Sequence, residues 1–148
     1  MGKKVVVGGT FDIIHVGHIR FLREAKKLAK DGKLIVIVAR DSTVKRIKGH
    51  EPIFDEKERL EIVRALKPVD VAILGNENSN FFEILKEIKP DVVVMGLPLS
   101  ASGRYSEQTF KTLKFAFEIS KYFKVYMIDE RLTTKLASRM NAKEKDAM

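Results

Sequence analysis

The sequence predicts a three-layer α/β fold built on an open, five-stranded parallel sheet, and two observations support this. Five short apolar runs rich in β-branched residues alternate along the chain with segments whose apolar residues recur every three to four positions. Two of the runs, residues 33–39 and 92–95, lack the alternation of polar and apolar residues that is typical of a strand with one solvent-exposed face. Helices are therefore expected on both faces of these strands, as in a doubly wound sheet.

The boundaries of the elements follow from local signals. Asp55, Asn80 and Ser106 are expected to cap helix N-termini, and Gly32 is expected to end the first helix in a left-handed conformation. Pro90 ends a later helix, because proline cannot continue one. The expected order is strand 3–11 with its turn, helix 16–30, strand 33–39, a polar segment 40–54 with a short helical turn at 42–47, helix 56–66, strand 69–74, helix 81–88, strand 92–95, loop 97–104, a helix through residue 121, strand 124–128 and a last helix from residue 133.

Composition excludes several classes of protein. With 45% hydrophobic and 32% charged residues, the 148-residue chain is typical of one globular domain, and no linker or repeat divides it. No apolar run approaches the ~18 residues of a membrane span. Lys3 and Lys4 are not followed by the apolar core of a signal peptide, so a cytoplasmic protein is expected. Cysteine is absent, which excludes disulfides and thiolate-held metals.

Positive charge is concentrated in the first third of the chain. The formal net charge is +8; residues 1–50 hold twelve Lys and Arg against four Asp and Glu, whereas the remainder holds sixteen of each. Positive potential attracts polyanions, so a phosphate-rich ligand is expected here, with a solvated basic face as the alternative. Nucleic acid is not expected as a partner, because the aromatic residues lie mainly in apolar patterns and offer no stacking platform.

A candidate anion site lies in residues 5–18, Val-Val-Val-Gly-Gly-Thr-Phe-Asp-Ile-Ile-His-Val-Gly-His. Three β-branched residues predict a buried strand, and Gly8 and Gly9 allow a sharp turn and the close approach of a ligand. Two of the three histidines in the chain, His15 and His18, follow where a helical pattern begins. A strand, a glycine turn and a helix start together present backbone N–H groups to a phosphate. The alternative is a pair of surface histidines at a helix start.

The two halves of this stretch, Gly-Thr-Phe-Asp at 9–12 and His-Val-Gly-His at 15–18, resemble the nucleotidyltransferase superfamily with a His-x-Gly-His motif. Members of that superfamily join a nucleoside triphosphate to a phosphorylated or acidic acceptor and release pyrophosphate. The resemblance implies that His15 and His18 are catalytic and stabilise the α-phosphate and the leaving group. Imidazole N–H groups at a helix start can donate to the oxygens on which charge develops.

A narrower resemblance covers the basic segment. Residues 38–53 (Val-Ala-Arg-Asp-Ser-Thr-Val-Lys-Arg-Ile-Lys-Gly-His-Glu-Pro-Ile) and 56–63 (Glu-Lys-Glu-Arg-Leu-Glu-Ile-Val) are similar to archaeal FAD synthases, with glycerol-phosphate cytidylyltransferases as near relatives. This implies that Lys45 and Lys48 neutralise phosphates and that Arg59 reaches the nucleotide or the acceptor; a solvated basic loop is the alternative. The nucleotide-binding residues implied in all are Gly9, Thr10, Phe11, Gly17, Lys45, Lys48 and Arg59.

A second resemblance begins where the first ends. After residue 96 the chain lacks the Gly-Tyr-Asp-Gln-like segment and the later Ser/Thr-rich or basic segment of the nucleotidyltransferases. Val-Met-Gly-Leu-Pro-Leu-Ser-Ala-Ser-Gly-Arg-Tyr-Ser-Glu-Gln-Thr at 94–109 and Ile-Asp-Glu-Arg-Leu-Thr-Thr at 128–134 instead resemble ribonuclease-H-like nucleases related to Holliday-junction resolvases and pre-ribosomal-RNA processing enzymes. The sequence therefore predicts a chimera within one domain, nucleotidyltransferase-like over 1–96 and nuclease-like over 97–148.

The first resemblance implies a Rossmann-like scaffold with strand order 3-2-1-4-5 and an activity that converts ATP and FMN to FAD and pyrophosphate, assisted by Mg²⁺. No residue is assigned as a metal ligand. One alternative is cytidylyl transfer to glycerol phosphate, and another is a non-catalytic chimeric scaffold with residual nucleotide or anion binding. A metal-dependent nuclease is a further class; it needs converging carboxylates, of which Glu130 is one candidate. The expected partners are a nucleoside triphosphate and a phosphorylated acceptor, with no membrane.

Overall fold

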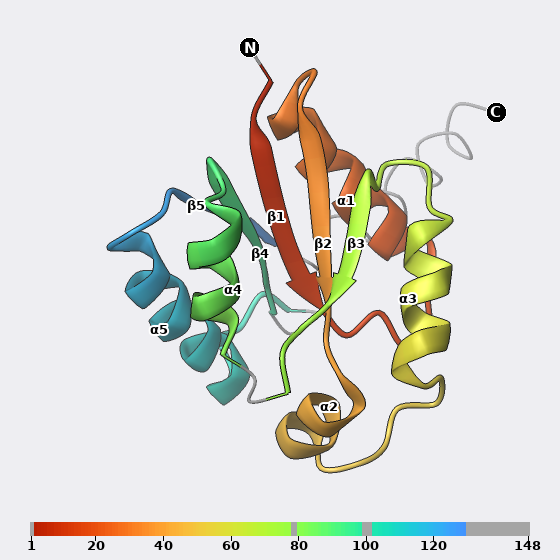
Figure 1. Cartoon of the computed structure of the whole chain (residues 1–148). Helices are drawn as coiled ribbons and strands as arrows, with labels where there is room; N and C mark the ends of the chain where they lie inside the picture. The colour runs from red at the N-terminus through yellow and green to blue at the C-terminus, as the bar shows by residue number, and fades with distance from the viewer. Residues whose placement is uncertain (1, 78–79, 99–101, 130–148) are drawn as a thin grey trace, which may run out of the picture.

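The computed structural model describes residues 2–77, 80–98 and 102–129, and its centre is a parallel sheet with the strand order β3-β2-β1-β4-β5 (Figure 1). The sheet confirms the predicted α/β class, its five strands and their order. Strand pairing is continuous from Lys4 opposite Lys33 to Gly9 opposite Val38. The strands are β1 (Lys4–Gly9), β2 (Lys33–Val38), β3 (Val71–Leu74), β4 (Val92–Leu97) and β5 (Val125–Asp129).

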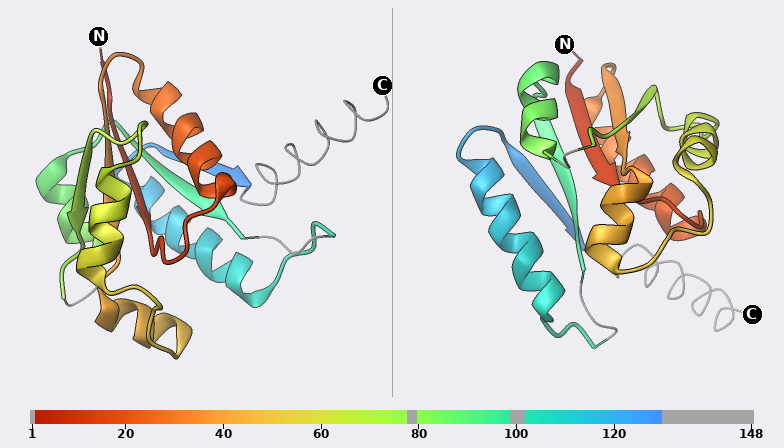
Figure 2. Two further views of the ribbon diagram at one scale, coloured as in Figure 1. Left: turned by 90° about the vertical axis from the view of Figure 1, so that its right-hand side faces the viewer. Right: turned by 60° about the horizontal axis from the view of Figure 1, so that its bottom comes forward.

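Helices cover both faces of this sheet, as Figure 2 shows. α1 (Val16–Ala29) and α3 (Glu56–Arg64) pack on one face, and α4 (Phe81–Ile88) and α5 (Glu107–Ser120) pack on the other. α2 (Asp41–Lys48) lies beyond the carboxyl end of β2, below the sheet in Figure 1. Within the described ranges, no helix is both long and apolar enough to cross a bilayer.

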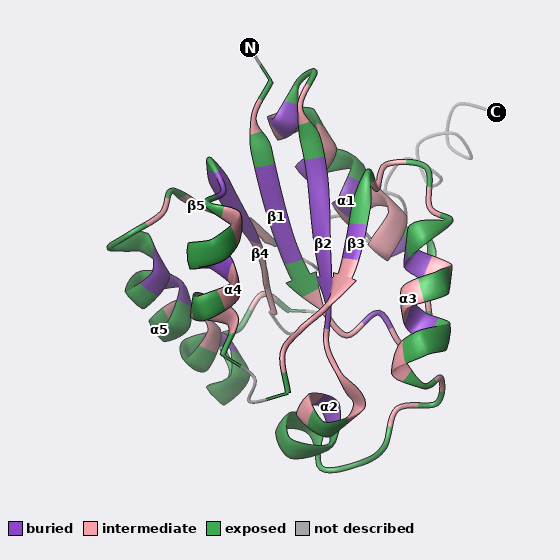
Figure 3. Ribbon diagram, in the orientation of Figure 1, coloured by how far each residue is buried: buried purple, intermediate pink, exposed green. Residues whose placement is uncertain are grey.

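The buried residues confirm that the central strands are covered on both faces (Figure 3). Val5, Val6 and Val7 of β1 are all 0% exposed. Because successive side chains of a strand point to opposite faces, Val5 and Val7 pack with α1 and α3, whereas Val6 packs with Leu85 of α4. Each such side chain contributes about 1.5–3 kcal/mol when fully buried, so β1 is a rigid base for the loop that follows it. The predicted turn at Gly8 and Gly9 is wrong: both are the last residues of β1, paired with Ile37 and Val38.

The predicted N-terminal caps are confirmed. The side chains of Asp55, Asn80 and Ser106 each accept a hydrogen bond from the backbone N–H three residues further on. Each bond satisfies a backbone donor that the helix itself leaves unpaired, which stabilises a helix by about 1 kcal/mol. These caps depend only on neighbouring residues, which is why the sequence is sufficient to predict them.

The prediction for Gly32 is wrong. Helix α1 ends at Ala29, and its C-cap residue, Lys30, takes the positive φ of 56°. Gly32 is required for another reason: a Cβ at this position would collide with the backbone of Lys3. The glycine therefore allows the turn before β2 to lie against the start of β1.

Other boundaries differ by a few residues, and α2 differs in kind. The sequence predicts only a short turn at 42–47, whereas α2 is a helix of eight residues that ends at Gly49 in a left-handed conformation. Val44 anchors it, with 2% of its surface exposed. β3 begins at Val71 rather than at residue 69, since Val69 still bonds back to Leu66 in a turn. The expected helix from residue 133 lies outside the described residues.

Candidate active site

Two cavities meet at the carboxyl ends of the strands, where the strand order reverses between β1 and β4. Open α/β sheets bind their ligands at such a switch point. One cavity has a volume of about 700 Å³ and is lined by residues of the segment 10–18, which carries His15 and His18 and is called the histidine loop below. The other cavity, of about 270 Å³, is mainly apolar. They share one wall, formed by Gly8, Gly9, Thr10 and Gly96. Two molecules bound in the two cavities would therefore meet along this wall.

His15 and His18 lie together in the larger cavity, at the start of α1. The Nδ1 atom of His15 accepts a hydrogen bond from the backbone N–H of Gly17 at 3.0 Å, and Nδ1 of His18 accepts from the N–H of His15 at 3.2 Å. An imidazole whose Nδ1 is an acceptor carries its proton on Nε2. The two rings, with centroids 4.2 Å apart, thus present two Nε2–H donors side by side.

The surroundings of His18 keep its ring neutral. Burial lowers the pKa of His18 below its ordinary value of 6.5, and the nearby charges of His15 and Lys48 lower it further. A neutral imidazole donates one hydrogen bond without adding a full charge to a site that already holds a lysine. The loop can therefore hold an anion through oriented N–H donors.

Phe11 packs against His18 of this loop. It is 5% exposed, its backbone has a φ of 54°, and its ring centroid lies 5.9 Å from that of His18. A Cβ on Gly9 would lie 2.7 Å from the Phe11 ring, so only glycine fits between this ring and the cavity. Gly9, Thr10, Phe11 and Gly17 all line the larger cavity, and the structure thus brings these predicted residues together.

Arg59 lies elsewhere than the sequence suggests. Its side chain is 0% exposed and lines neither cavity. Its guanidinium donates to the carbonyl oxygens of Phe54, Thr10 and Ala39 at 2.6–2.9 Å and to Asp41 Oδ1 at 2.7 Å. In this structure Arg59 does not extend toward a ligand; it joins the histidine loop to the segments before and after α2.

Asp12 makes a second connection of this kind. Its two carboxylate oxygens accept from the backbone N–H groups of Ile53 and Phe54 at 2.8 and 2.9 Å. Burial alone would raise the pKa of Asp12, but these two hydrogen bonds and the charges of Arg59 and Lys48 hold it below its ordinary value. The carboxylate stays ionised and fastens the chain before α3 to the histidine loop.

The two lysines of α2 lie in different places. Lys48 lines the larger cavity with the histidines. Lys45 lines neither cavity and forms an exposed ion pair with Glu51 at 3.4 Å. Only Lys48 therefore adds positive charge to the cavity directly.

The sequence interpretation missed two parts of the site. Gln108 and Thr112 of α5 line the larger cavity opposite the histidines, although the chain offers no polar side chain directly after β4. Their spacing of four residues places both on one face of a helix, and this was the only signal for them in the sequence.

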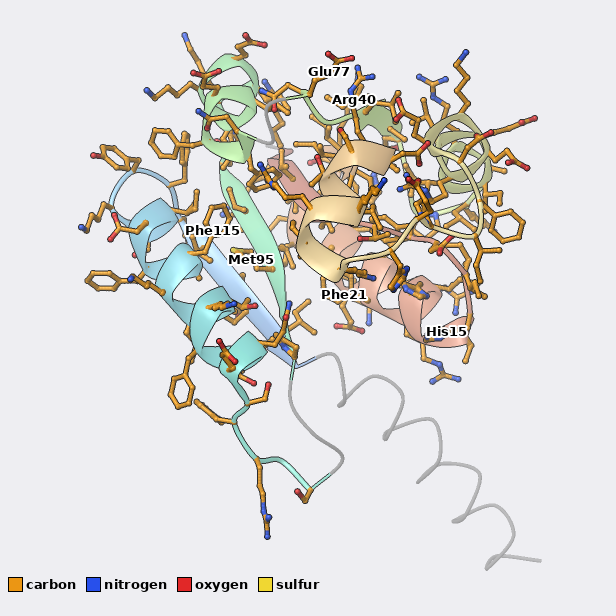
Figure 4. The ribbon with its side chains drawn as sticks, turned by 90° about the horizontal axis from the view of Figure 1, so that it is seen from below. His15, Phe21, Arg40, Glu77, Met95 and Phe115 are labelled. Carbon is orange, nitrogen blue, oxygen red and sulfur yellow. The ribbon has the colours of Figure 1, made fainter. Side chains whose placement is uncertain are left out.

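The smaller cavity was also not predicted. Its apolar lining comes from strands and helices far apart in the sequence: Ile37, Ile47, Phe81, Ile84, Met95 and Phe115. Figure 4 shows Met95 and Phe115 close together, with His15 on the opposite side of the molecule in this view. Arg40 also lines the smaller cavity. Arg40 donates to Gly75 O at 2.6 Å and pairs with Glu56 at 3.0 Å. The lining of this cavity suits an apolar group.

No group of three or more metal-ligating side chains occurs in the described ranges. Both oxygens of Asp12, the carboxylate that lines the larger cavity, already accept backbone N–H bonds. Mg²⁺ is often bound through one or two carboxylates, substrate phosphates and water rather than in a protein cage. The described residues suit an ion that arrives with a polyphosphate.

Comparison with known proteins finds similar sequences along most of the chain. The cytidylyltransferase-like family model matches residues 6–140. The FAD synthase of Pyrococcus abyssi is 39% identical over 137 residues, which cover 93% of this chain and 91% of that protein. The FAD synthase of Methanopyrus kandleri is 57% identical over 97 residues, which cover 65% of this chain and only 63% of that protein. None of these matches shows a nuclease segment, so the chimera stays a prediction.

Solved structures agree on the fold. The lipopolysaccharide core biosynthesis protein of Thermoplasma volcanium GSS1 has a TM-score of 0.69 and 37% identity, and the alignment covers 87% of this chain and 98% of that one. A protein of unknown function from Archaeoglobus fulgidus has a TM-score of 0.61 at 18% identity, with 86% and 90% covered. The second likeness concerns the fold alone.

Proposed function

Because the chain belongs to the cytidylyltransferase-like family, whose scaffold it has, we propose that it transfers an adenylyl group from ATP to FMN, forming FAD and pyrophosphate. The observation that carries the proposal is the pair of Nε2–H donors of His15 and His18 beside Lys48, in a cavity that shares a wall with an apolar one. Two relatives named FAD synthase support FAD as the product.

In the proposed reaction, a phosphate oxygen of FMN attacks the α-phosphorus of ATP. A new P–O bond forms, the bond from the α-phosphorus to the bridging oxygen breaks, and pyrophosphate leaves with that oxygen. The Mg²⁺ complex of ATP is the substrate, and its ion neutralises charge on the phosphates. His15 and His18 donate to the α-phosphate and the leaving group, where negative charge grows in the transition state.

The arrangement of donors suits this chemistry. Phosphoryl transfer needs positioning and electrostatic stabilisation rather than a covalent step by the protein. The Nδ1 bonds to the backbone of α1 fix the direction of both imidazole rings before substrate arrives. Lys48 supplies the charge, and the two oriented imidazole rings supply the geometry.

The smaller cavity favours FMN as the acceptor over glycerol phosphate. Phe81, Met95 and Phe115 offer apolar and aromatic surface to a flat ring, which FMN has and glycerol phosphate lacks. With its ring there, FMN could extend its phosphate to the shared wall at Gly9 and Thr10, next to the α-phosphate of ATP. Cytidylyl transfer to glycerol phosphate leaves this apolar surface without a role.

The origin of residues 97–148 is a separate proposal. The two nuclease-like motifs at 94–109 and 128–134 support a chimera, whereas the family model and the Pyrococcus abyssi protein match this chain on both sides of residue 96. A well-joined chimera should unfold in one cooperative thermal transition. A broad, non-cooperative transition would count against it, and metal-dependent cleavage of branched DNA would show that the nuclease activity survives.

The experiment for the transferase activity measures pyrophosphate release and the dinucleotide product. ATP with FMN is compared with CTP with glycerol 3-phosphate, using the wild type, His18→Ala and His50→Ala. His50 is a matched control, because it is exposed and lines neither cavity. The expected result is FAD and pyrophosphate from the wild type and His50→Ala, with a rate about 10²–10³-fold lower for His18→Ala. Wild-type release no greater than that of His18→Ala with both substrate pairs would refute the proposal.

A further inference from the structure

The wall of the larger cavity that faces the histidines is formed by the end of β4 and the first turns of α5. It contributes Gly96, Pro98, Gln108 and Thr112 to the lining. None of these four residues is charged. The lysine of the lining, Lys48, belongs to the histidine side, so the cavity has a basic part and a neutral polar part.

The first turn of α5 is held firmly against β4. Thr109 is 0% exposed, and its hydroxyl donates to the carbonyl oxygen of Pro98. The same oxygen atom of Thr109 accepts from the backbone N–H of Ser106 at 3.0 Å, and the Ser106 hydroxyl in turn accepts from the N–H of Thr109. A buried hydroxyl with both roles filled fixes a backbone, so the residue next to it, Gln108, projects from a rigid base.

The side-chain amide of Gln108 is the polar group of this wall that can still form hydrogen bonds with a ligand. The hydroxyl of Thr112 donates to the backbone oxygen of Gln108 at 3.0 Å, so its proton is already used. The side-chain amide of Gln108 has no hydrogen-bond partner among the described residues, and the residue is exposed. Its amide therefore offers one acceptor and two donor N–H groups toward the cavity.

We propose that Gln108 is a specificity-determining residue that hydrogen-bonds the base of the bound nucleotide. The inference rests on the proposed function, in which the phosphates occupy the histidine side near Lys48. The nucleoside then extends along the neutral wall of α5. An amide with adjacent donor and acceptor matches the exocyclic amino group and the neighbouring ring nitrogen of adenine, and such a bidentate pair is a recurrent mode of adenine recognition.

The test measures binding by calorimetry with three probes: ATP, purine riboside triphosphate, which lacks the 6-amino group, and inorganic tripolyphosphate. Wild type is compared with Gln108→Met, which keeps the length of the side chain and removes its amide. The control is Lys114→Met, which introduces the same side chain on the same helix at an exposed position outside both cavities.

The wild type and Lys114→Met are expected to bind ATP about tenfold more tightly than purine riboside triphosphate. Gln108→Met is expected to bind the two nucleotides equally and to bind tripolyphosphate as the wild type does. An unchanged preference for ATP in Gln108→Met, or an equal loss for all three probes, would overturn the role of Gln108 and leave the proposed function standing. A wild type that binds neither ATP nor tripolyphosphate would overturn both.

Discussion

Arg59 and Asp41 form an ion pair, with 2.7 Å between Nη2 and Oδ1, although the Arg59 side chain has no exposed surface. The pair lies where α2 begins, and the same guanidinium holds Thr10 of the histidine loop. A buried arginine is stable only when its donors are filled, and here the acceptors come from separate segments. The geometry of the loop therefore depends on a residue that lies outside its cavity.

Replacing Arg59 should destabilise the fold strongly. Arg59→Met removes four hydrogen bonds and leaves Asp41 without its partner, and breaking a buried pair in this way costs about 3–5 kcal/mol. The free energy of unfolding in urea is the measurement. Arg46→Met is the control, since Arg46 is exposed on α2 and should change stability by less than about 0.5 kcal/mol. Equal effects of the two variants would contradict the structural role of Arg59.

Stability should fall on acidification because of His18. Its pKa in the folded state lies below the ordinary 6.5, so between these two values the unfolded chain binds more protons than the folded one. This contribution to stability is fully present above pH 6.5 and is lost as the pH falls through the folded pKa.

The measurement is the urea midpoint of the wild type and of His18→Ala between pH 7.5 and pH 5. The wild type should lose more stability over this range than the variant does. Parallel pH profiles would show that burial does not hold His18 neutral. Asp12 and Asp70 also have lowered pKa values, but they act below their ordinary value of 3.8 and leave this range unaffected.

The two lysines of α2 should differ in their effect on ATP binding. Lys48→Met is expected to weaken ATP binding roughly 10- to 150-fold, because a charge-assisted hydrogen bond contributes roughly 1.5–3 kcal/mol. Lys45→Met should have little effect, since Lys45 pairs with Glu51 outside both cavities. Titration calorimetry at two salt concentrations checks this. If Lys45→Met had the larger effect, the phosphates would lie on the outer face of α2.

Gly9→Ala should disturb the histidine loop, because the new Cβ would lie 2.7 Å from the ring of Phe11. Overpacking of this kind costs about 1–3 kcal/mol, and the displaced ring should also weaken ATP binding. Gly75→Ala is the matched control: a Cβ there has ordinary contacts of 3.7 Å with Ile37 and Val38. Thermal unfolding and ATP titration of both variants measure the difference, and a harmless Gly9→Ala would mean that Phe11 moves freely.

Much of the fold could be predicted because its signals are local. Residues 33–39 and 92–95 show their burial in their own composition, and the caps at Asp55, Asn80 and Ser106 act within one helical turn. Helix α2 could not be predicted in the same way. Its sequence is polar, and it is stabilised by Val44 and by the bond from Asp41 to Arg59, which lies far along the chain.

The same difference between local and long-range contacts decides which residues of the site could be predicted. His15 and His18 were evident because they and their backbone donors lie within four residues of one another. Arg59 and Gln108 could not be placed, since a charged or polar residue on a helix gives no sign of whether it faces a carbonyl, a cavity or water. Arg59 is buried and Gln108 is exposed, and only the packing of α3 and α5 on the sheet decides between these outcomes.

The single wall between the two cavities has an evolutionary consequence. The apolar cavity is built largely from side chains on the α4 and α5 face of the sheet, whereas the histidines belong to α1 on the opposite face. In the proposed reaction, substitutions at Phe81 or Phe115 would change which acceptor fits without altering the imidazole donors. Substitutions at Gly9 or Thr10 would affect both proposed substrates at once. With the proposed function, a scaffold arranged in this way can diverge in acceptor while its phosphate chemistry is inherited unchanged.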